Sequence, residues 1–274
     1  LIIGSKGFLG RHLSKSLKNK IHNVYELSRL NGDYTKKNSI NKYKNIDLII
    51  CVAGIVGVSE SWKYPHTYLE KNYIGTLNVL EYCRINKTKL IFVSSYLYGN
   101  SKLKTTEKNR LYFTNPYDLS KKFSDNLCSA YNKLFDINII ILRTFNIYGP
   151  GQKKNFLIPF IIDKIKKRKK IELNSFYSKR DYLYIDDFCE LISLLINYEK
   201  NFQIFNVGSG KSYTNLTIAK TLLSLLKKNN YIVEKKNKNS EIYSTHANIS
   251  KLKKELNWEP KISLKKGLTK LLKL

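Results

Sequence analysis

The feature that most constrains this chain is the alternation of short apolar runs with stretches of helical periodicity, which starts at the first residue. Apolar runs rich in β-branched residues occupy positions 1–3, 24–27, 46–52, 89–93 and 137–142. Such short, nearly continuous runs predict strands that are covered on both faces. Helical periodicity lies between them over residues 8–18, 65–85 and 117–134. The alternation predicts an α/β chain with a doubly wound parallel sheet and right-handed crossovers, the Rossmann-type arrangement.

The pattern changes after Gly149-Pro150-Gly151. A short strand is expected over residues 182–185, and helices over 186–198, 215–228 and 263–274. We therefore expect one domain of residues 1–146, with 182–207 returning to it. The remaining residues, 147–181 and 208–274, would form a smaller mixed α/β lobe.

The formal charge of +28 would suggest a nucleic-acid partner, but its distribution does not. The charge comes mainly from Lys and is spread along the chain, whereas a nucleic-acid footprint clusters basic residues on one face. The densest run, residues 164–170, is typical of the polar face and end of a helix. We interpret the charge as a solvated surface that would attract an anionic diphosphate by steering.

Membrane insertion and secretion are not expected from the sequence. No apolar run reaches the roughly 18 residues that a transmembrane helix needs. Four cysteines are scattered through apolar or helical stretches without paired spacing, which is typical of buried, reduced thiols. These features indicate a cytoplasmic protein, and we expect no metal site.

Glycines spaced by three recur in Gly4-Ser5-Lys6-Gly7-Phe8-Leu9-Gly10. The first expected strand ends just before this segment and a helix begins at about Phe8. A strand, a tight turn and a helix in this order direct backbone N–H groups and the positive end of the helix at a pyrophosphate. A tight turn without a ligand is the alternative. The context favours a dinucleotide site in the first domain, and the residues expected to contact it are Gly4, Gly7, Phe8, Leu9 and Gly10.

The end of the second expected strand should indicate which dinucleotide binds. An acidic residue there would bind the ribose 2′-hydroxyl of NAD, whereas Arg would suit the 2′-phosphate of NADP. Glu26 lies inside the strand, and the strand ends in Ser28-Arg29. A hydroxyl and a guanidinium suit a phosphate, so NADP is favoured. NAD stays open, because a register shift of about two residues would move Glu26 to the strand end.

A third motif, Tyr117-Asp118-Leu119-Ser120-Lys121, places a phenol and an ammonium one helical turn apart. A neighbouring ammonium lowers the pKa of a phenol, as a general acid or base acting on a sugar hydroxyl or ketone requires. Ser94 follows a buried strand, where a parallel sheet presents side chains to a ligand. These three residues are the expected catalytic residues: Tyr117, Lys121 and Ser94.

Taken in order, these motifs resemble the extended short-chain dehydrogenase/reductases, the family of NAD(P)-dependent nucleotide-sugar epimerases and dehydratases. The resemblance covers nearly the whole chain. It rests on residues 4–10, 94–99, 115–121 and 143–151, and continues through 72–76, 179–182, 206–210 and 258–260. It implies a nucleotide-diphosphate sugar as substrate, with the dinucleotide bound by the domain of residues 1–146 and the substrate bound by the lobe of residues 147–181 and 208–274. It also implies a homodimer formed by the helices that carry Asn72 and Tyr117.

The resemblance also implies roles for individual residues. Tyr117 would be the acid or base, Lys121 would tune it and contact the ribose, and Ser94 would bind the reacting sugar oxygen. Asp33 would contact the adenine, and Ala53 and Gly54 would line the cofactor. The expected substrate contacts are Ser95, Tyr96, Asn146 and Arg180.

Two departures from the family pattern narrow the reaction. Ser95-Tyr96 stand where dehydratases of the family carry Asp-Glu, so a 4,6-dehydratase is not expected. The late substrate-binding Arg of epimerases is missing near residues 244–248. His246 would take its place or simply pack, and Tyr96 would act as a second acid or pack against the sugar.

Two enzyme hypotheses follow from these departures. The favoured one is NADPH-dependent reduction of a 4-keto-6-deoxy nucleotide sugar, and the alternative is an NAD-dependent 4-epimerase. A protein that binds the dinucleotide without catalysis is less favoured, because Tyr117 and Lys121 are both present.

Overall fold

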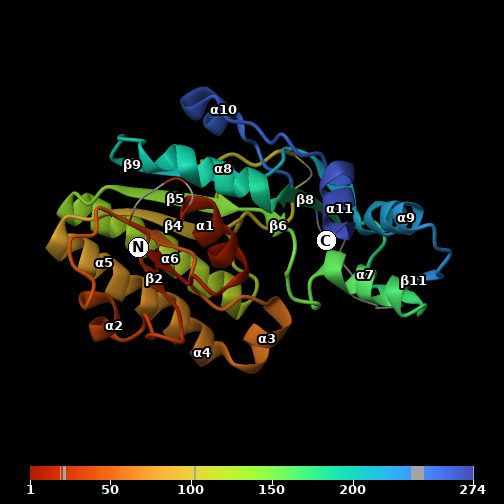
Figure 1. Cartoon of the computed structure of the whole chain (residues 1–274), viewed down its shortest axis with the longest axis horizontal. Helices are drawn as coiled ribbons and strands as arrows, with labels where there is room; N and C mark the ends of the chain where they lie inside the picture. Colours follow the sequence, from red (N-terminus) through yellow and green to blue (C-terminus); the bar gives the residue numbers. More distant parts are fainter. Residues whose placement is uncertain (19, 21–22, 102, 236–243, 274) are drawn as a thin grey trace. The chain divides into compact units, whose positions relative to one another are not determined.

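The computed structural model describes residues 1–18, 20, 23–101, 103–235 and 244–273 (Figure 1). The chain divides into two compact units. Unit 1 comprises residues 1–99, 107–144 and 189–206, and unit 2 comprises residues 100–106, 145–188 and 207–274. The assignment of cofactor binding to one part of the chain and substrate binding to the other stays a prediction.

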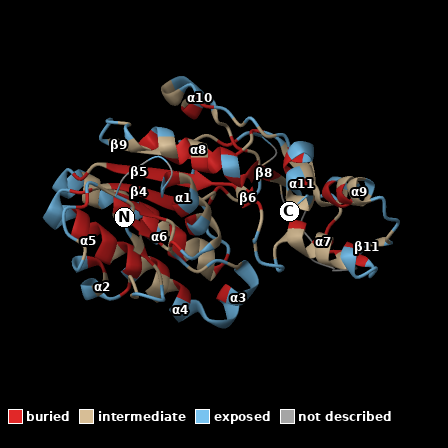
Figure 2. Ribbon diagram, viewed as in Figure 1, coloured by how far each residue is buried: buried red, intermediate tan, exposed pale blue. Residues whose placement is uncertain are grey.

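Unit 1 is built on a six-stranded sheet, and its strand order is β2-β1-β3-β4-β5-β9. The pairs from β2 through β5 are parallel, which confirms the predicted doubly wound sheet. Apolar runs fill the strands because both faces are covered, and Figure 2 shows them buried. The strand bounds are β1 Ile2–Ile3, β2 Glu26–Leu27, β3 Leu48–Cys51, β4 Lys89–Ser95, β5 Ile139–Thr144 and β9 Phe202–Val207.

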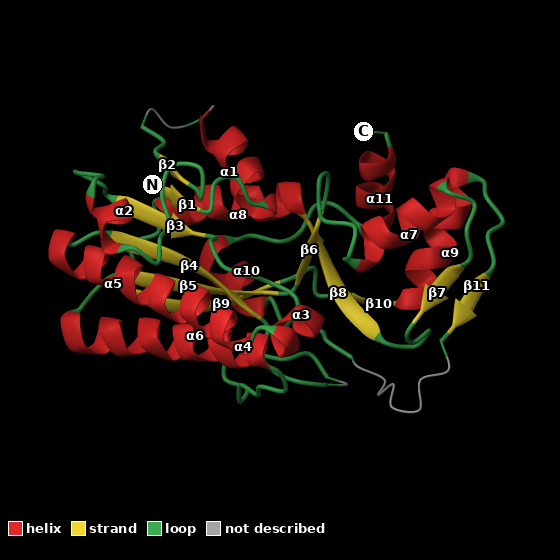
Figure 3. Cartoon of the chain, turned by 90° about the horizontal axis from the view of Figure 1, so that it is seen from below, coloured by secondary structure: helices red, strands yellow, loops and turns green. Residues whose placement is uncertain are grey.

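Helices cover both faces of this sheet. Figure 3 shows α1 (Phe8–Lys18) and α8 (Ile185–Ile196) on one side, and α5 (Gly75–Asn86) and α6 (Pro116–Phe135) on the other. The core between the layers consists of apolar side chains from the strands, α5 and α6. The remaining helices of this unit are α2 Lys37–Asn41, α3 Val58–Lys63 and α4 Pro65–Leu69.

The helix expected over residues 65–85 is interrupted. A π-helical turn, η1 (Glu70–Ile74), separates α4 from α5. The carbonyl of Asn72 accepts hydrogen bonds from the Thr76 and Ser124 hydroxyls, and its side chain is held by another segment of unit 1. A π-turn inserts an extra residue into a helix and often marks a functional site. Apolar periodicity cannot reveal such an insertion.

Unit 2 holds two small sheets. One has the order β10-β8-β6, in which β8 pairs in parallel with β6 and antiparallel with β10. The other pairs β11 with β7. The strands are β6 Asn146–Tyr148, β7 Ile171–Leu173, β8 Lys179–Tyr184, β10 Ser212–Thr214 and β11 Ile232–Glu234, and the helices are α7 Leu157–Lys166, α9 Asn215–Leu226, α10 Ser250–Leu256 and α11 Leu264–Leu272.

Within the described ranges, no helix is both long enough and apolar enough to span a bilayer.

Candidate active site

The glycine turn follows the first strand directly. β1 ends at Ile3 and α1 begins at Phe8. Gly4 has φ of 91°, and a Cβ atom built on it would lie 2.8 Å from the backbone nitrogen of Ala53. A Cβ on Gly10 would lie only 2.1 Å from the carbonyl oxygen of Gly4. Only glycine fits such approaches, so the turn lets α1 begin against the carboxyl ends of β1 and β3.

This turn fits a dinucleotide. The first N–H groups of a helix lack partners within the helix, and those of α1 begin at Phe8 beside the turn. Together with the helix dipole they form an anion site, and a side chain at Gly4 or Gly10 would fill the space that brings the segments together. Ala53 lies at this turn, where a cofactor-lining residue was predicted. The pyrophosphate contacts themselves stay a prediction.

At the end of β2, Glu26 is already engaged by α1. Its carboxylate pairs with Lys18 Nζ at 2.5 Å and accepts a hydrogen bond from Ser14. These bonds lower the pKa of Glu26. Ser28 and Arg29 follow the strand, and Arg29 is exposed. The two residues that follow β2 thus carry a hydroxyl and a guanidinium, as expected from the sequence.

Asp33 lies in a turn, where two hydrogen bonds and one ion pair stabilise its carboxylate. It accepts from the Thr35 amide at 3.0 Å and hydroxyl at 2.8 Å, and pairs with Lys71 at 2.9 Å. Burial alone would raise its pKa, but the bonds from Thr35 and Lys71 lower it to about 2. The adenine contact expected of Asp33 stays a prediction.

Tyr117 lies in the first turn of α6, because the residues just before it define where that helix begins. Asn115 caps it by accepting from the Asp118 amide at 2.9 Å, and Pro116 takes the first helical position. The Tyr117 ring lies edge-on to that of Tyr68, with ring centres 6.3 Å apart. The Ser95 side chain, at the end of β4, acts to lower the pKa of this phenol. Two predicted site residues, Tyr117 and Ser95, therefore belong to one electrostatic neighbourhood.

The pKa of Tyr117 is shifted in the direction opposite to the prediction. Burial raises it to about 12, while the Ser95 side chain acts to lower it. Lys121 lies one turn along the same helix, but its ammonium donates to the carbonyl of Val93 at 2.8 Å. The prediction that this ammonium lowers the Tyr117 pKa is therefore wrong for this structure. The phenol is protonated at neutral pH, the form in which it can donate a proton.

Ser94 is buried, with 3% of its surface exposed. Its hydroxyl has no hydrogen-bond partner within the part of the chain that the structure describes. Buried polar atoms in proteins are nearly always paired, and exceptions often mark a ligand site. Ser94 precedes Ser95 in β4, so a buried hydroxyl without a partner among the described residues lies at the carboxyl end of this strand. This fits a bound substrate or cofactor oxygen.

The sequence did not assign a role to Asn72, although it lies in a quoted motif. Its side chain accepts from the Ile55 amide at 2.9 Å and donates to the Ile55 carbonyl at 3.2 Å. It also donates to the Ser120 hydroxyl at 2.9 Å. Asn72 thereby joins the segment after β3, which contains Gly54, to the helix that carries Tyr117. An Asn within an otherwise helical segment is the signal that could have indicated this.

The other predicted substrate residues belong to unit 2. Asn146 on β6 donates from its amide to the Asp181 carbonyl at 3.1 Å, and Arg180 on β8 donates to the Lys179 carbonyl at 3.0 Å. His246 bonds through Nε2 to the Gly210 carbonyl at 2.7 Å, which agrees with a packed histidine. The substrate roles of Asn146 and Arg180, and of Tyr96 in unit 1, stay predictions. No group of three or more His, Cys, Asp or Glu side chains among the described residues could hold a metal.

A parallel sheet with a glycine turn after β1, and a helix bearing Tyr and Lys after β4, defines a dinucleotide-dependent enzyme. Residues 1–208 match the model of the NAD dependent epimerase/dehydratase family. The chain therefore belongs to this family of nucleotide-sugar enzymes, which are extended short-chain dehydrogenase/reductases that use NAD(P). The resemblance inferred from the sequence is confirmed.

Three relatives show the range of the family. The chain is 30% identical to a dTDP-D-glucose 4,6-dehydratase of Dictyostelium discoideum, over 82% of this chain and 61% of that one, so it spans about three fifths of that relative. It is 29% identical to a UDP-glucuronate 4-epimerase of Thermodesulfobacterium geofontis, over 98% and 93%. A UDP-glucuronic acid 4-epimerase of Bacillus cereus, solved with UDP-glucuronic acid and NAD, has a TM-score of 0.87 and 26% identity, over 99% and 97%.

Proposed function

We propose that this chain catalyses the NADPH-dependent reduction of a 4-keto-6-deoxy sugar carried on a nucleoside diphosphate, with Tyr117 as general acid. The observation that carries the proposal is the group at the end of β4. The Tyr117 phenol is protonated and its pKa responds to Ser95, and the preceding strand residue, Ser94, has a buried hydroxyl without a partner among the described residues. Reduction of a ketone requires a proton donor and a hydrogen bond to the same oxygen, and these two residues would supply both.

Each of the three expected catalytic residues would have its own role in the reduction. When bound, NADPH would provide the hydride that reduces the carbonyl carbon of the sugar. Tyr117 gives its phenolic proton to the carbonyl oxygen as negative charge develops there. Ser94 donates a hydrogen bond to that oxygen and orients the ketone. The Lys121 ammonium, one turn along α6, would bind the ribose of the cofactor by donating to its hydroxyls.

The choice of NADP rests on the end of β2. Glu26, which could otherwise accept from a ribose 2′-hydroxyl, is occupied by Lys18 and Ser14 of α1. Arg29 is exposed two residues beyond the strand, where a guanidinium would bind a 2′-phosphate. In unit 2, Asn146 and Arg180 would bind the diphosphate and the nucleoside of the substrate. The net charge of +28 would steer that anion.

A 4-epimerase is the second candidate, and the relatives favour it. The matched proteins of Thermodesulfobacterium geofontis and Bacillus cereus are both 4-epimerases of UDP-linked glucuronic acid. Epimerisation would use the same residues, but Tyr117 would first remove a proton, and hydride would pass to NAD and return to the other face of the sugar. A dehydratase is not proposed, because Ser95 and Tyr96 provide no acid–base carboxylates.

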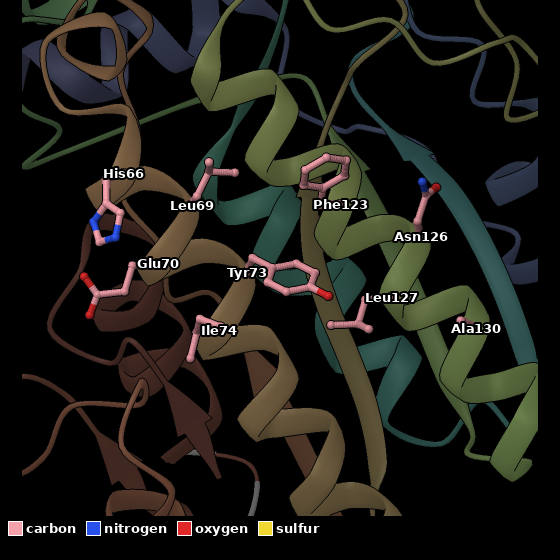
Figure 4. A pocket seen from close by; sticks show the side chains of 9 residues that line it. All are labelled: His66, Leu69, Glu70, Tyr73, Ile74, Phe123, Asn126, Leu127 and Ala130. Carbon is pink, nitrogen blue, oxygen red and sulfur yellow. The ribbon is translucent and has the colours of Figure 1, made fainter.

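A homodimer is part of the proposal. Unit 1 carries a groove of about 650 Å³ between the α4–η1 segment and α6 (Figure 4). Within it, the Tyr73 and Phe123 rings lie edge-on at 6.2 Å, and Ile74 and Phe123 are each about two fifths exposed. The groove is lined by His66, Leu69, Glu70, Tyr73, Ile74, Phe123, Asn126, Leu127 and Ala130. Helices bearing apolar side chains of this kind would pair with a second copy. Light scattering should give twice the chain mass, and a monomer at micromolar concentration would contradict this.

A cytoplasmic location also belongs to the proposal. The four cysteines are free and buried, as is usual in a reducing compartment.

The experiment that tests the reaction starts with the nucleotide in the purified protein. The protein is denatured, and the released nucleotide is identified by mass spectrometry. A site that is free of nucleotide and prefers NADPH, together with oxidation of NADPH on addition of a 4-keto-6-deoxy nucleotide sugar, would support reduction. Tightly retained NAD, with interconversion of 4-epimers and no net NADPH consumption, would replace the reductase with the epimerase.

A further inference from the structure

Helix α6 carries a second buried ionisable group beyond Lys121. Tyr117, Lys121 and Asp125 are spaced by four residues and so share one face of the helix. Lys121 is 6% exposed and Asp125 is 1% exposed. The proposed reaction uses Tyr117 and Lys121 but gives Asp125 no task. A buried carboxylate requires an explanation, because burying a charge is costly unless it is paired.

Arg143 on β5 holds this carboxylate. Its Nε donates to Asp125 Oδ2 at 2.8 Å, and both side chains are almost wholly buried. Its Nη1 also donates to the Tyr98 hydroxyl at 3.2 Å and to the Glu107 carbonyl at 3.0 Å. The other oxygen of Asp125, Oδ1, has no hydrogen-bond partner within the described residues. Arg143 thus fixes the carboxylate through one oxygen and is itself fixed by two further acceptors.

Lys121 contacts no anion among the residues that the structure describes. Its ammonium donates to the Val93 carbonyl at 2.8 Å and lies 4.8 Å from the centre of the Phe92 ring. Burial lowers the pKa of Lys121, and nearby thiols and Asp125 act in the opposite direction. The thiols of Cys51 and Cys128 are neutral, because burial raises the pKa of Cys51 to about 11 and that of Cys128 well above its usual value. Asp125 is therefore the negative charge that acts on Lys121 at neutral pH.

We propose that Asp125 is a positioning residue for the cofactor and catalytic site, and that its carboxylate, anchored by Arg143, keeps Lys121 an ammonium ion one helical turn from Tyr117. The proposal deepens the proposed function and rests on it for its catalytic meaning. Without the Asp125 charge, the partners left to Lys121 within the described part of the chain would be a carbonyl and an aromatic ring. A buried amine in such surroundings loses its proton at a lower pH.

The other groups that face this pair would not titrate in the same range. Cys51 comes from β3, and Cys128 lies on α6 itself. Tyr98 follows β4, and burial raises its pKa to about 12. Arg143 stays charged, and Glu107 meets it through a main-chain carbonyl. A change between pH 7 and pH 10 in cofactor binding that depends on Asp125 would therefore report on Lys121.

The test is the pH dependence of binding of NADPH, or of NADH if the wild type prefers it, followed by the fluorescence of the reduced cofactor. The ammonium would donate to the ribose hydroxyls, so binding should weaken where Lys121 loses its proton. In Asp125→Asn the pH of that weakening should fall by about one unit or more, the size expected for loss of one nearby buried charge. Asp125→Glu keeps the charge and should restore the wild-type profile.

A purely structural role predicts a different outcome. Asp125→Asn would then lower the melting temperature while leaving the pH of weakening unchanged, and that result would overturn the proposal. Lys121→Met supplies the reference, because Asp125→Asn should cause no pH shift in that background. A shift that persists there would also overturn the proposal.

A second variant serves as a control in case Asp125→Asn does not fold. Asp125→Asn leaves Arg143 buried without its carboxylate and could prevent folding. The double variant Asp125→Asn/Arg143→Gln removes both charges and should still lower the pH of weakening, though by less than Asp125→Asn alone, because loss of the guanidinium acts in the opposite direction. An unshifted profile there would contradict the proposal. Since the readout is cofactor binding, it remains interpretable if the wild type fails to reduce any keto sugar. That failure would reject the proposed reaction and leave the Asp125 result standing.

Discussion

The glycine turn and the sheet-facing side of α6 are both parts of the candidate site, but different interactions determine their structures. In the turn the constraint is steric. A Cβ atom on Gly10 would lie 2.1 Å from the Gly4 carbonyl oxygen, because two backbone segments are in close contact there. On the face of α6 the constraint is electrostatic: the charged groups of Lys121 and Asp125 are buried, and the Tyr117 side chain is partly buried. The turn acts through main-chain geometry and the helix through protonation states.

The difference indicates how each region should respond to mutation. Filling space at the turn should cost stability and cofactor binding together. Changing a polar group on α6 or at the end of β4 should alter turnover or its pH dependence while the fold persists. The four substitutions below separate these two kinds of response.

The largest effect is expected for Tyr117→Phe. Removing the phenolic proton donor should lower kcat by about 10²- to 10⁴-fold, the usual contribution of a positioned general acid. NADPH binding should be unchanged, as measured by titration of cofactor fluorescence. Tyr231→Phe is the matched control, because that ring is 84% exposed in unit 2 and should leave kcat as in the wild type. Full turnover in Tyr117→Phe would show that Tyr117 on α6 is not the proton donor.

Gly10→Ala should follow in size. The added methyl group must displace the Gly4 carbonyl, which forms part of the turn. Overpacking of this kind should reduce the free energy of unfolding by about 3 kcal/mol, or prevent folding, and should weaken NADPH binding in any protein that folds. Urea unfolding measures the change. Lys15→Ala, at an exposed position of α1, should alter stability little, and an equal loss in both variants would reject the steric explanation.

Ser94→Ala should separate stability from activity. The Ser94 hydroxyl is buried and unpaired within the described residues, so its removal should leave the melting temperature unchanged or raise it slightly. Turnover should fall by about 10-fold or more, because the hydroxyl would bind the reacting oxygen. A variant that loses stability and keeps its activity would show that Ser94 packs rather than binds.

The smallest effect is expected for Arg29→Ser. Loss of the guanidinium should raise the Kd for NADPH by about 10-fold and leave that for NADH unchanged, because only NADPH carries the 2′-phosphate. Isothermal titration gives both constants. Lys44→Ser removes an exposed cation that precedes β3 and should change neither. Equal effects on NADPH and NADH would point to NAD as the cofactor.

Much of the fold could be predicted from the sequence, because its parallel strands are continuous apolar runs. β3, β4 and β5 lie at or near the expected positions, and α6 begins one residue before the expected start. The strands of unit 2 are harder to predict: β6, β7, β10 and β11 have three residues each, too few to show a period.

The candidate site divides in the same way. Spacing alone predicts that Tyr117 and Lys121 share a helix face, and the strand-end position of Ser94 follows from its apolar run. The pKa of Tyr117 could not be predicted, because it depends on burial by neighbours such as Tyr68. The pairing of Asp125 with Arg143 was missed because Arg143 comes from another strand, a contact that no local pattern specifies.

The most direct test of the chemistry is isotopic. The protein is supplied with NADPH deuterated at the transferable position of the nicotinamide and with a 4-keto-6-deoxy nucleotide sugar, and the product is analysed by mass spectrometry and NMR. We expect one deuterium on the sugar carbon that carried the ketone. In Tyr117→Phe the transfer should be slower than in the wild type by about 10²-fold or more. A sugar that is turned over without acquiring deuterium, or equal transfer in Tyr117→Phe, would contradict a reduction in which Tyr117 delivers the proton.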